Sequence, residues 1–291
     1  MSDIIKISPN DKAYPRLLKQ ISDPPEQLYC RGNLKLLNTF CFAVVGTRKI
    51  TNYGKEATNH IIAGLAGSGM TIVSGLAIGV DATAHQAALN YSLPTIAVLG
   101  STVDNSGISP QSNYNLAKEI LRKNGLIISE YGKKSFIGKS NFAIRDRIIS
   151  GLCKGVLIVE GAEKSGSLIT AKSALDQNRD VFALPGNIFS QVSVGTNGLI
   201  KNGAKMVTSA QDILEEYDKN PKLNLELRND ISTKDPVEKK ILDILDELGE
   251  LTADTIIKES GLETSSVLVT LSILEIKNRI KNLGNGKFRK I

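Results

Sequence analysis

Short apolar runs rich in valine and isoleucine alternate with helix-like stretches between Phe40 and about Val207, and this alternation constrains the fold most strongly. The runs lie at 40–46, 71–75, 95–100, 125–130, 155–160 and 180–186. Continuous apolar runs of this length indicate strands that are covered on both faces, as in parallel sheets. The stretches between them have helical spacing, and several end in glycine or asparagine. The pattern predicts an α/β fold with a doubly wound, mainly parallel sheet.

The alternation stops after the strand-helix region, where residues 211–235 are polar, acidic and contain Pro221. A final helix followed by a linker is expected there. Beyond it come three helix-like segments and a Gly284-Asn285-Gly286 turn between short strand-like runs, which predict a small winged-helix domain. The predicted division is an N-terminal extension packing on the core (1–38), the main domain (39–218), the linker (219–235) and the winged-helix domain (236–291).

Basic side chains exceed acidic ones, and the excess is uneven along the chain. The formal net charge is +6, and residues 36–210 contain 17 basic and 10 acidic side chains. From Lys277 to Lys290 there are six basic side chains and no acidic one. This distribution favours a polyanionic partner, with charge for solubility as the alternative.

Membrane and secreted classes are not expected. The first residues lack the charged and apolar regions of a secretory signal, and no apolar run reaches the roughly 18 residues that span a bilayer. The three cysteines, Cys30, Cys41 and Cys153, have no C-x-x-C spacing. We therefore expect neither a disulfide framework nor a zinc site, and a cytoplasmic location.

Motifs for catalysis are also missing from the sequence. It contains no Walker A loop, no G-x-S-x-G elbow and no H-E-x-x-H motif. His60 and His85 lack metal-ligand spacing, and carboxylates near strand ends such as Asp81 and Glu160 have no nucleophile beside them. The sequence predicts a binding protein rather than an enzyme, with no metal and no cofactor.

Loops that follow the predicted strands lie at the edge where such a sheet places its ligands. Gly46 permits a tight turn before a helix, and the guanidinium of Arg48 offers a bidentate partner for phosphate. The loop at 74–85 is interpreted as scaffold. Two further loops, at 141–151 and 160–172, add an aromatic ring, cations and small residues before a helix: Phe142, Arg145, Arg147, Ser165, Gly166, Ser167 and Lys172. Together these loops predict a phosphate-binding rim.

Structural interpretations of the same residues remain open. Arg48 is also suited to cap a helix or to pair with Asp81. The run Arg145-Asp146-Arg147 is also suited to a surface ion-pair cluster, and Ser165 to a simple helix N-cap.

The motifs "AVVGTRKITNYG", "GMTIVSGLAIGVDATAHQAAL", "RDRIISGL", "SGSLITAKSAL" and "FALPGNIFSQVSVGTNGLI" occur in that order and closely resemble the DNA-processing protein A family (DprA, also called Smf). The resemblance spans roughly residues 10 to 210, and the tail resembles that family's optional winged-helix domain. It implies a Rossmann-like fold and a cytoplasmic protein of natural transformation. Such a protein binds single-stranded DNA, protects it and helps to load RecA onto it. The implied partners are single-stranded DNA, RecA, single-strand-binding protein and a second copy in a homodimer.

The resemblance also implies which residues contact DNA. They are Arg48 with its neighbour Lys49, Phe142, Arg145, Arg147, Gly166, Ser167 and Lys172. Two departures matter. Asp146 stands where the family usually has asparagine, and the segment from Ser109 to Asn113 replaces the family's Y-P-x-x-N. Asp146 is suited either to orient the two arginines or to weaken phosphate binding.

A nucleotide-processing enzyme of the phosphoribohydrolase-like Rossmann group is the alternative. Its P-G-G-x-G-T-x-x-E loop is faintly echoed here, but Leu199 stands at the position of the catalytic glutamate. The winged-helix domain also leaves two roles open, because its would-be recognition helix is apolar on more than its inner face. Protein contact and duplex DNA binding both fit that helix.

Overall fold

The computed structural model describes residues 3–133, 135–138, 140–217, 236–276 and 279–290. The chain forms two compact units, Met1–Asn224 and Leu225–Ile291, which are considered separately. The expected linker at 219–235 lies outside the described residues.

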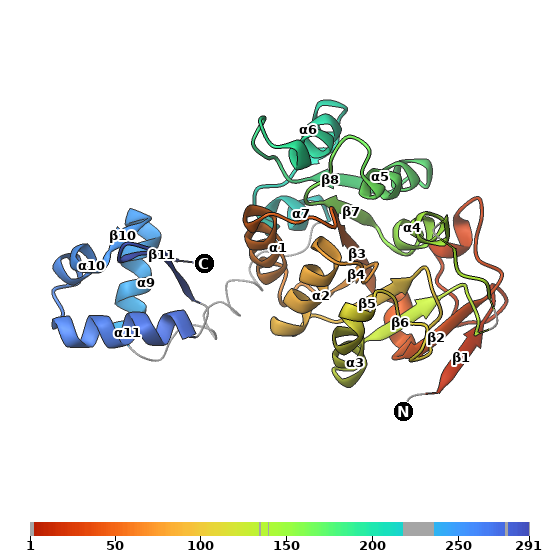
Figure 1. Ribbon diagram of the computed structural model, residues 1–291, viewed down its shortest axis with the longest axis horizontal. Coiled ribbons are helices and arrows are strands. Elements are labelled where there is room, and N and C mark those ends of the chain that lie inside the picture. The colour runs from red at the N-terminus through yellow and green to blue at the C-terminus, as the bar shows by residue number, and fades with distance from the viewer. Residues whose placement is uncertain (1–2, 134, 139, 218–235, 277–278, 291) are drawn as a thin grey trace. The chain divides into compact units, whose positions relative to one another are not determined.

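Among the described residues of the larger unit, nine strands form one sheet with the order β1-β2-β6-β5-β4-β3-β7-β8-β9 (Figure 1). The strands are β1 (Ile4–Ile7), β2 (Leu28–Gly32), β3 (Phe40–Val45), β4 (Met70–Ser74), β5 (Thr95–Leu99), β6 (Leu126–Ser129), β7 (Gly155–Ile158), β8 (Asp180–Ala183) and β9 (Lys205–Met206). β3 to β9 are parallel, whereas β1 and β2 are antiparallel additions at one edge. The chain winds outward from β3 in one direction and then returns to β7, so the order reverses between β3 and β7. This confirms the predicted doubly wound, Rossmann-like sheet.

Helices cover both faces of the sheet. They are α1 (Asn52–Gly64), α2 (Val80–Asn90), α3 (Tyr114–Arg122), α4 (Ser140–Leu152), α5 (Gly166–Asp176), α6 (Val194–Lys201) and α7 (Ala210–Glu216), with short 3-10 helices η1 (Leu18–Gln20), η2 (Leu34–Asn38), η3 (Gln111–Asn113) and η4 (Gln191–Ser193). In β3, Ala43 and Val45 pack in the core with α4 and α5, while Phe42 and Val44 pack in the core with α1, α2 and α7. Both sets are buried, which explains why the strand is apolar at consecutive positions.

The N-terminal residues form part of the same core. β1 pairs with β2, and β2 pairs with β6, so this segment extends the sheet. Leu18 and Leu28 are fully buried in the cluster that also contains residues of α4. The sequence predicted an extension packing on the core, but not that it would contribute strands.

The smaller unit contains α9 (Pro236–Leu248), β10 (Leu251–Thr252), α10 (Ala253–Ser260), α11 (Thr264–Ile276), β11 (Ile280–Gly284) and β12 (Lys287–Lys290). Its strands pair in the order β10-β12-β11, and this confirms the predicted winged-helix domain. Val267, Leu271 and Leu274 of α11 are buried in the core of this unit.

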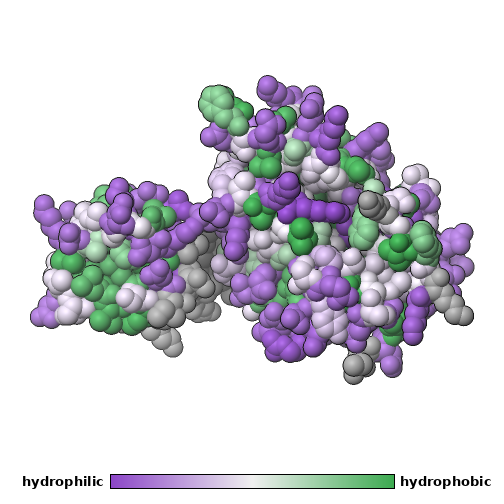
Figure 2. Space-filling model, viewed as in Figure 1, coloured by the Kyte–Doolittle hydropathy of each residue, from purple (hydrophilic) through white to green (hydrophobic). Residues whose placement is uncertain are grey.

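The outer face of α11 carries several exposed apolar side chains beside one charged residue, Glu275. Leu268, Val269 and Ile273 are 47%, 59% and 38% exposed, and Figure 2 shows hydrophobic surface over this helix. Across both units, the described helices include none with the length and apolar content that a membrane span requires.

Candidate nucleic-acid interface

A pocket of about 390 Å³ opens where the strand order reverses, between the loops that follow β3 and β7. It is lined by Gly46 and Arg48 after β3, by Phe142 and Asp146 of α4, and by Gly166 and Ser167 of α5. This is the position at which open α/β sheets bind their ligands. The structure therefore brings together residues from all three loops that the sequence predicted as a phosphate-binding rim.

Backbone hydrogen bonds fix the loop that carries Arg48. Thr47 donates its N–H to the carbonyl of Glu160 at 2.7 Å and accepts one from Val80 N–H at 3.2 Å. Gly79 has a φ of +86°, and a Cβ there would lie 2.3 Å from the carbonyl oxygen of Thr47, so only glycine fits. The loops after β3, β4 and β7 are thus locked to one another.

The side chain of Glu160 holds the chain where this loop leads into α1. Its carboxylate accepts hydrogen bonds from Thr51 N–H at 2.9 Å and from Thr51 Oγ1 at 2.5 Å. The residue is buried, and it fixes the start of α1. Its environment is that of a structural anchor.

Arg48 is exposed and makes no hydrogen bond or ion pair with another described residue. The alternative pairing with Asp81 is not formed, because the Asp81 carboxylate accepts from the backbone N–H groups of Gly75 and Ala77 at 3.1 and 3.4 Å. Lys49 is exposed beside Arg48 but does not line the pocket. Arg48 is therefore a free cation at the pocket mouth, held on a rigid loop.

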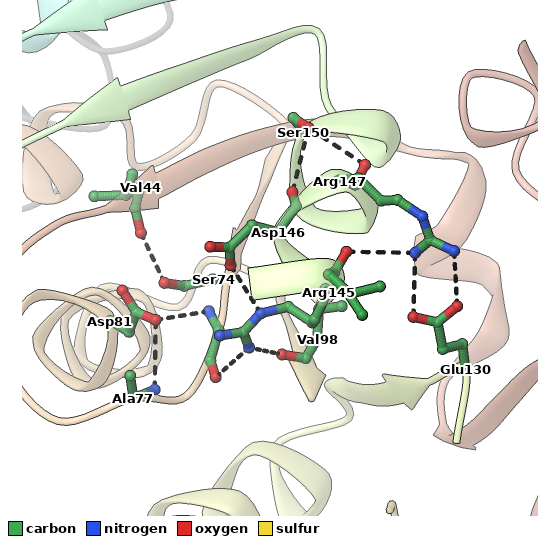
Figure 3. Close-up of polar contacts among 12 residues, drawn as sticks. Val44, Ser74, Ala77, Asp81, Val98, Glu130, Arg145, Asp146, Arg147 and Ser150 are labelled. Carbon is green, nitrogen blue, oxygen red and sulfur yellow. Dashed lines mark hydrogen bonds and ion pairs between the residues drawn. The ribbon is translucent and has the colours of Figure 1, made fainter. Parts of the chain in front are cut away.

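Arg145 lies in the interior and is only 4% exposed. Its Nη1 donates to the carbonyl of Gly75 at 2.7 Å and to the carbonyl of Val98, and its Nε donates to Asp146 Oδ1 at 3.0 Å (Figure 3). A Cβ at Gly75 would lie 2.5 Å from Arg145 Nη1, so the guanidinium fills the space that this glycine leaves. Arg145 lines the pocket, but most of its hydrogen bonds tie α4 to the ends of β4 and β5.

The carboxylates of Asp146 and Asp81 both lie near the guanidinium of Arg145. Burial raises the pKa of Asp146 to about 6, although the neighbouring Arg145 opposes the shift. Burial also raises the pKa of Asp81, again against the charge of Arg145. Both side chains line the pocket. Asp146 thus orients Arg145 but not Arg147, so the expectation that it would orient both arginines holds for Arg145 alone.

Arg147 points away from this cluster, as Figure 3 shows. Its Nη2 lies 2.8 Å from Glu130 Oε2, and its Nε lies 2.9 Å from Asp23 Oδ2. Successive residues of a helix are about 100° apart, so positions 145 and 147 face nearly opposite sides of α4. The structure therefore places Arg147 outside the pocket, where its guanidinium is paired with the carboxylates of Glu130 and Asp23.

The start of α5 contributes hydrogen-bond donors to the pocket and no charged side chain. Ser165 is the N-cap, and its Oγ accepts from Ser167 N–H at 3.4 Å. Gly166 is exposed, and a Cβ there would meet no atom within 4 Å, so this backbone is open to a ligand. Lys172 is exposed further along α5 and does not line the pocket.

Phe142 is half-buried at the start of α4, where its Cα would lie 2.9 Å from a Cβ at Gly100. Phe136, in the loop between β6 and α4, carries a second aromatic ring that the sequence did not predict; it does not line the pocket. It is 89% exposed. The only sequence signal was "KKSF", in which an aromatic residue stands two positions after a pair of lysines, and this does not indicate whether the ring is exposed.

The described residues around the pocket include several binding groups. Within the described ranges, no group of three or more His, Cys, Asp or Glu side chains is placed to hold a metal ion. His85 is buried against Thr95 Oγ1 at 2.8 Å, and burial lowers its pKa to about 3. A free cation, an aromatic ring and open backbone donors around one pocket suit a ligand that carries phosphate and a ring.

Comparison with known families gives two matches. Residues 6–218 match the model of DNA recombination-mediator protein A, and residues 224–286 match the model of the DprA winged helix domain.

Individual relatives agree with these matches. The chain is 43% identical over 208 residues to the DNA processing protein DprA of Streptococcus pneumoniae, covering 72% of each chain. It is 44% identical over 209 residues to the protein Smf of Escherichia coli, covering 72% of this chain and 55% of that protein.

Solved structures show the same likeness. The crystal structure of DprA from S. pneumoniae is 42% identical and superposes with a TM-score of 0.70, covering 74% of each chain. A structure that describes the single-stranded DNA binding mode of DprA from Helicobacter pylori is 34% identical, with a TM-score of 0.66. It covers 75% of this chain and 99% of that chain. The chain therefore belongs to the DprA/Smf family of DNA recombination-mediator proteins.

Proposed function

We propose that this protein binds single-stranded DNA, with the pocket between β3 and β7 as the centre of its binding surface. The observation that carries the proposal is Arg48, an unpaired cation at the mouth of a pocket that also offers Phe142 and open backbone donors. The structure of the H. pylori relative concerns single-stranded DNA binding, which supports the same ligand class. Lys49 and Lys172, both exposed, would extend the cationic surface beyond the pocket.

Phosphate contacts should dominate this binding. Aromatic residues make up 5% of the chain and tryptophan is absent, so few stacking platforms exist. Each neutralised phosphate on single-stranded DNA adds a slope of about −0.7 to the dependence of log K on log salt concentration. Titrating a fluorescent oligo-dT across salt concentrations tests the proposal, since a steep negative slope is expected. Failure to bind at low salt would overturn it.

The cellular role that we infer is that of a cytoplasmic mediator in natural transformation. The protein would protect incoming single strands and help RecA displace single-strand-binding protein from them. Membership of a family described as recombination mediators supports this role. A strand-exchange assay with RecA and single-strand-binding protein tests it, and stimulation by this protein is the expected result.

We further infer that two copies associate as a homodimer. Apolar side chains protrude beside α6, with Ile188 79% exposed and Phe189 87% exposed, and Val194 of α6 is 41% exposed. Water-exposed apolar side chains gathered in this way favour a protein contact. Native mass measurement with and without oligo-dT reports the subunit count and strand binding together. A monomer at all concentrations would contradict dimerisation.

Turnover of nucleotides is not part of the proposed function. Leu199, at the position of the catalytic glutamate in the phosphoribohydrolase-like group, is partly buried against the apolar core. An aliphatic side chain cannot act as an acid or a base. Incubation with purine ribonucleoside monophosphates should release no free base, and release by the purified protein would support the enzymatic alternative.

The winged-helix domain is assigned separately. The wing, formed by β11 and β12, carries basic side chains whose charge is partly neutralised. Lys290 Nζ lies 2.6 Å from Asp246 Oδ2, and Arg289 Nη1 lies 3.4 Å from Glu250 Oε1. With the apolar face of α11, this favours protein contact over duplex binding. Deleting residues 236–291 and measuring both DNA affinity and self-association separates the two roles.

A further inference from the structure

The loop between β6 and α4 carries an exposed aromatic ring, that of Phe136, which is 89% exposed. Before the ring, Ser135 donates its N–H to the carbonyl of Gly132 at 2.8 Å. After it, Gly138 donates its N–H to Asn141 Oδ1 at 2.9 Å, and a Cβ at Gly138 would lie 3.5 Å from Phe136 Cε1. The ring therefore projects into solvent from a loop that is shaped by hydrogen bonds on both sides of it.

This loop lies at the same edge of the sheet as the pocket between β3 and β7. Strands β3 to β6 are parallel, so the loops after them all follow the carboxyl ends of their strands. In the sheet order, β6 lies three strands from β3, which is about 14 Å at the usual strand spacing.

The pocket covers most of the interval between β3 and β6. Its lining includes Gly46 after β3, Ala77 after β4, and Phe142. Phe142 lies over the end of β5, because a Cβ at Gly100, directly after that strand, would be 2.9 Å from Phe142 Cα. Phe136 therefore follows the next strand beyond the part of the sheet edge that the pocket covers.

The surroundings of Phe136 are basic. Lys133 is exposed in the same loop, and residues 131–145 contain four basic side chains and no acidic one. Glu130, directly before this segment, has its carboxylate paired with Arg147 Nη2 at 2.8 Å. The loop thus presents positive charge beside an aromatic ring, and the carboxylate at its base is neutralised.

A cation beside an exposed ring suits unpaired nucleic acid. Sequence-tolerant binding of single strands combines a positive surface along the backbone with aromatic rings on which bases stack. A protein contact would instead call for a contiguous apolar patch. The exposed residues of this segment besides Phe136 include Lys133, Ser135 and Ser140, which are polar.

We propose that bound single-stranded DNA leaves the pocket on its β6 side, runs along the carboxyl edge of the sheet, and stacks a base on Phe136. The inference rests on the proposed function, since it takes the pocket as the start of this path. It adds a direction for the strand and a second contact that only strands longer than the pocket can reach. Any base can stack on the ring, so this contact is independent of sequence.

Strand length separates Phe136 from the pocket. A thymidine dinucleotide should bind the unaltered protein and Phe136→Ala equally, since it occupies the pocket without reaching the loop. A thymidine dodecamer should bind Phe136→Ala about five- to a hundredfold more weakly, the range for loss of one stacked base. Calorimetric titration at low salt measures both affinities, because phosphate contacts are strongest there.

A fluorescent reporter tests the stacking itself. The chain contains no tryptophan, so Phe136→Trp introduces a single indole at this position. The dodecamer should quench its fluorescence by stacking, whereas an abasic oligomer with the same number of phosphates should not. The matched control is Leu175→Trp, at a side chain that is 61% exposed near the end of α5. Since α5 runs from the pocket back toward the opposite edge of the sheet, this indole should remain unquenched.

The outcomes are separable. Equal affinity of the unaltered protein and Phe136→Ala for the dodecamer would overturn the path toward β6 while leaving the proposed function intact. Quenching of Phe136→Trp that is absent, or that the abasic oligomer matches, would overturn it too. A loss already complete with the dinucleotide would place the ring in the pocket and so contradict a second contact. Failure of the unaltered protein to bind either oligomer would instead contradict the proposed function, and this inference with it.

Discussion

Arg145 donates from Nε to Asp146 Oδ1 at 3.0 Å, and both residues are buried beneath the pocket. Asp81 adds a second carboxylate to the same cluster. The guanidinium therefore balances charge inside the protein and holds the ends of β4 and β5 to α4. Arg145, which the resemblance implies contacts DNA, is thus a structural part of the pocket wall.

Replacing Arg145 by alanine should destabilise the protein strongly. The change would leave buried carboxylates without their cation and the carbonyls of Gly75 and Val98 without a donor. Loss of one partner from a buried ion pair costs about 3–5 kcal/mol. Denaturant unfolding measures the loss, with Arg122→Ala, a side chain 69% exposed, as the control. Native stability with weakened DNA binding would show that Arg145 contacts phosphate instead.

The pH dependence of stability should carry the signature of Asp146. Its pKa is about 6 in the folded protein against an ordinary value of 3.8. The folded state thus binds a proton between about pH 4 and pH 6 that the unfolded state releases. The contribution of Asp146 to the free energy of unfolding is therefore full below about pH 4 and is lost as the pH rises through 6.

Asp146→Asn removes this loss, so the variant should gain stability relative to the unaltered protein as the pH rises from 4 to 6. The charged groups that face Asp146 are Arg145 and Asp81, and both remain. His85, whose pKa is about 3, stays neutral throughout this window. Urea unfolding at several pH values measures the difference. A stability difference that does not change with pH would contradict the assigned shift.

Arg147→Ala should leave DNA binding nearly unchanged. Its guanidinium is paired with Glu130 and Asp23 and does not line the pocket. The expected slope of log K against log salt equals that of the unaltered protein. Stability should fall by more than the roughly 1 kcal/mol of a surface ion pair, because Glu130, whose side chain is 15% exposed, would lose its cation. A slope reduced by one phosphate contact would place Arg147 on the DNA path.

Phe136→Ala should weaken binding without altering its salt dependence. The ring is 89% exposed, so its removal costs little stability, and stacking of one base on an aromatic ring contributes about 1–3 kcal/mol. Affinity for oligo-dT should therefore fall by about five- to a hundredfold at every salt concentration. Unchanged affinity would exclude Phe136 from the binding surface.

The sequence predicted the sheet and the winged-helix domain because both depend on local periodicity. Continuous apolar runs identified β3 to β8, and the Gly284-Asn285-Gly286 turn identified the wing. β1 and β2 were not predicted as strands, since β1 is short and Ile4 and Ile5 are each 45% exposed at the sheet edge. Their pairing depends on β6, far away in sequence.

The site was predictable in part. Parallel strands end at one edge, so Arg48, Phe142 and Gly166 were correctly expected to lie together. The different environments of Arg145 and Arg147 were not predictable from the sequence. They depend on the rotation of α4 about its axis and on two partners far away in the chain, Asp23 before β2 and Glu130 after β6. Phe136 was missed because a loop has no periodicity to indicate which side chains are exposed.

The most direct measurement is the salt dependence of oligo-dT binding by Arg48→Ala beside the unaltered protein. Arg48 has no partner among the described residues, so the substitution should leave stability unchanged. Affinity should fall for every sequence, and the slope of log K against log salt should become shallower by about 0.7, the value for one phosphate contact. Arg122→Ala, the matched arginine at the end of α3, should change neither quantity. An unaltered slope and affinity in Arg48→Ala would contradict the central claim that this cation holds the DNA backbone at the pocket.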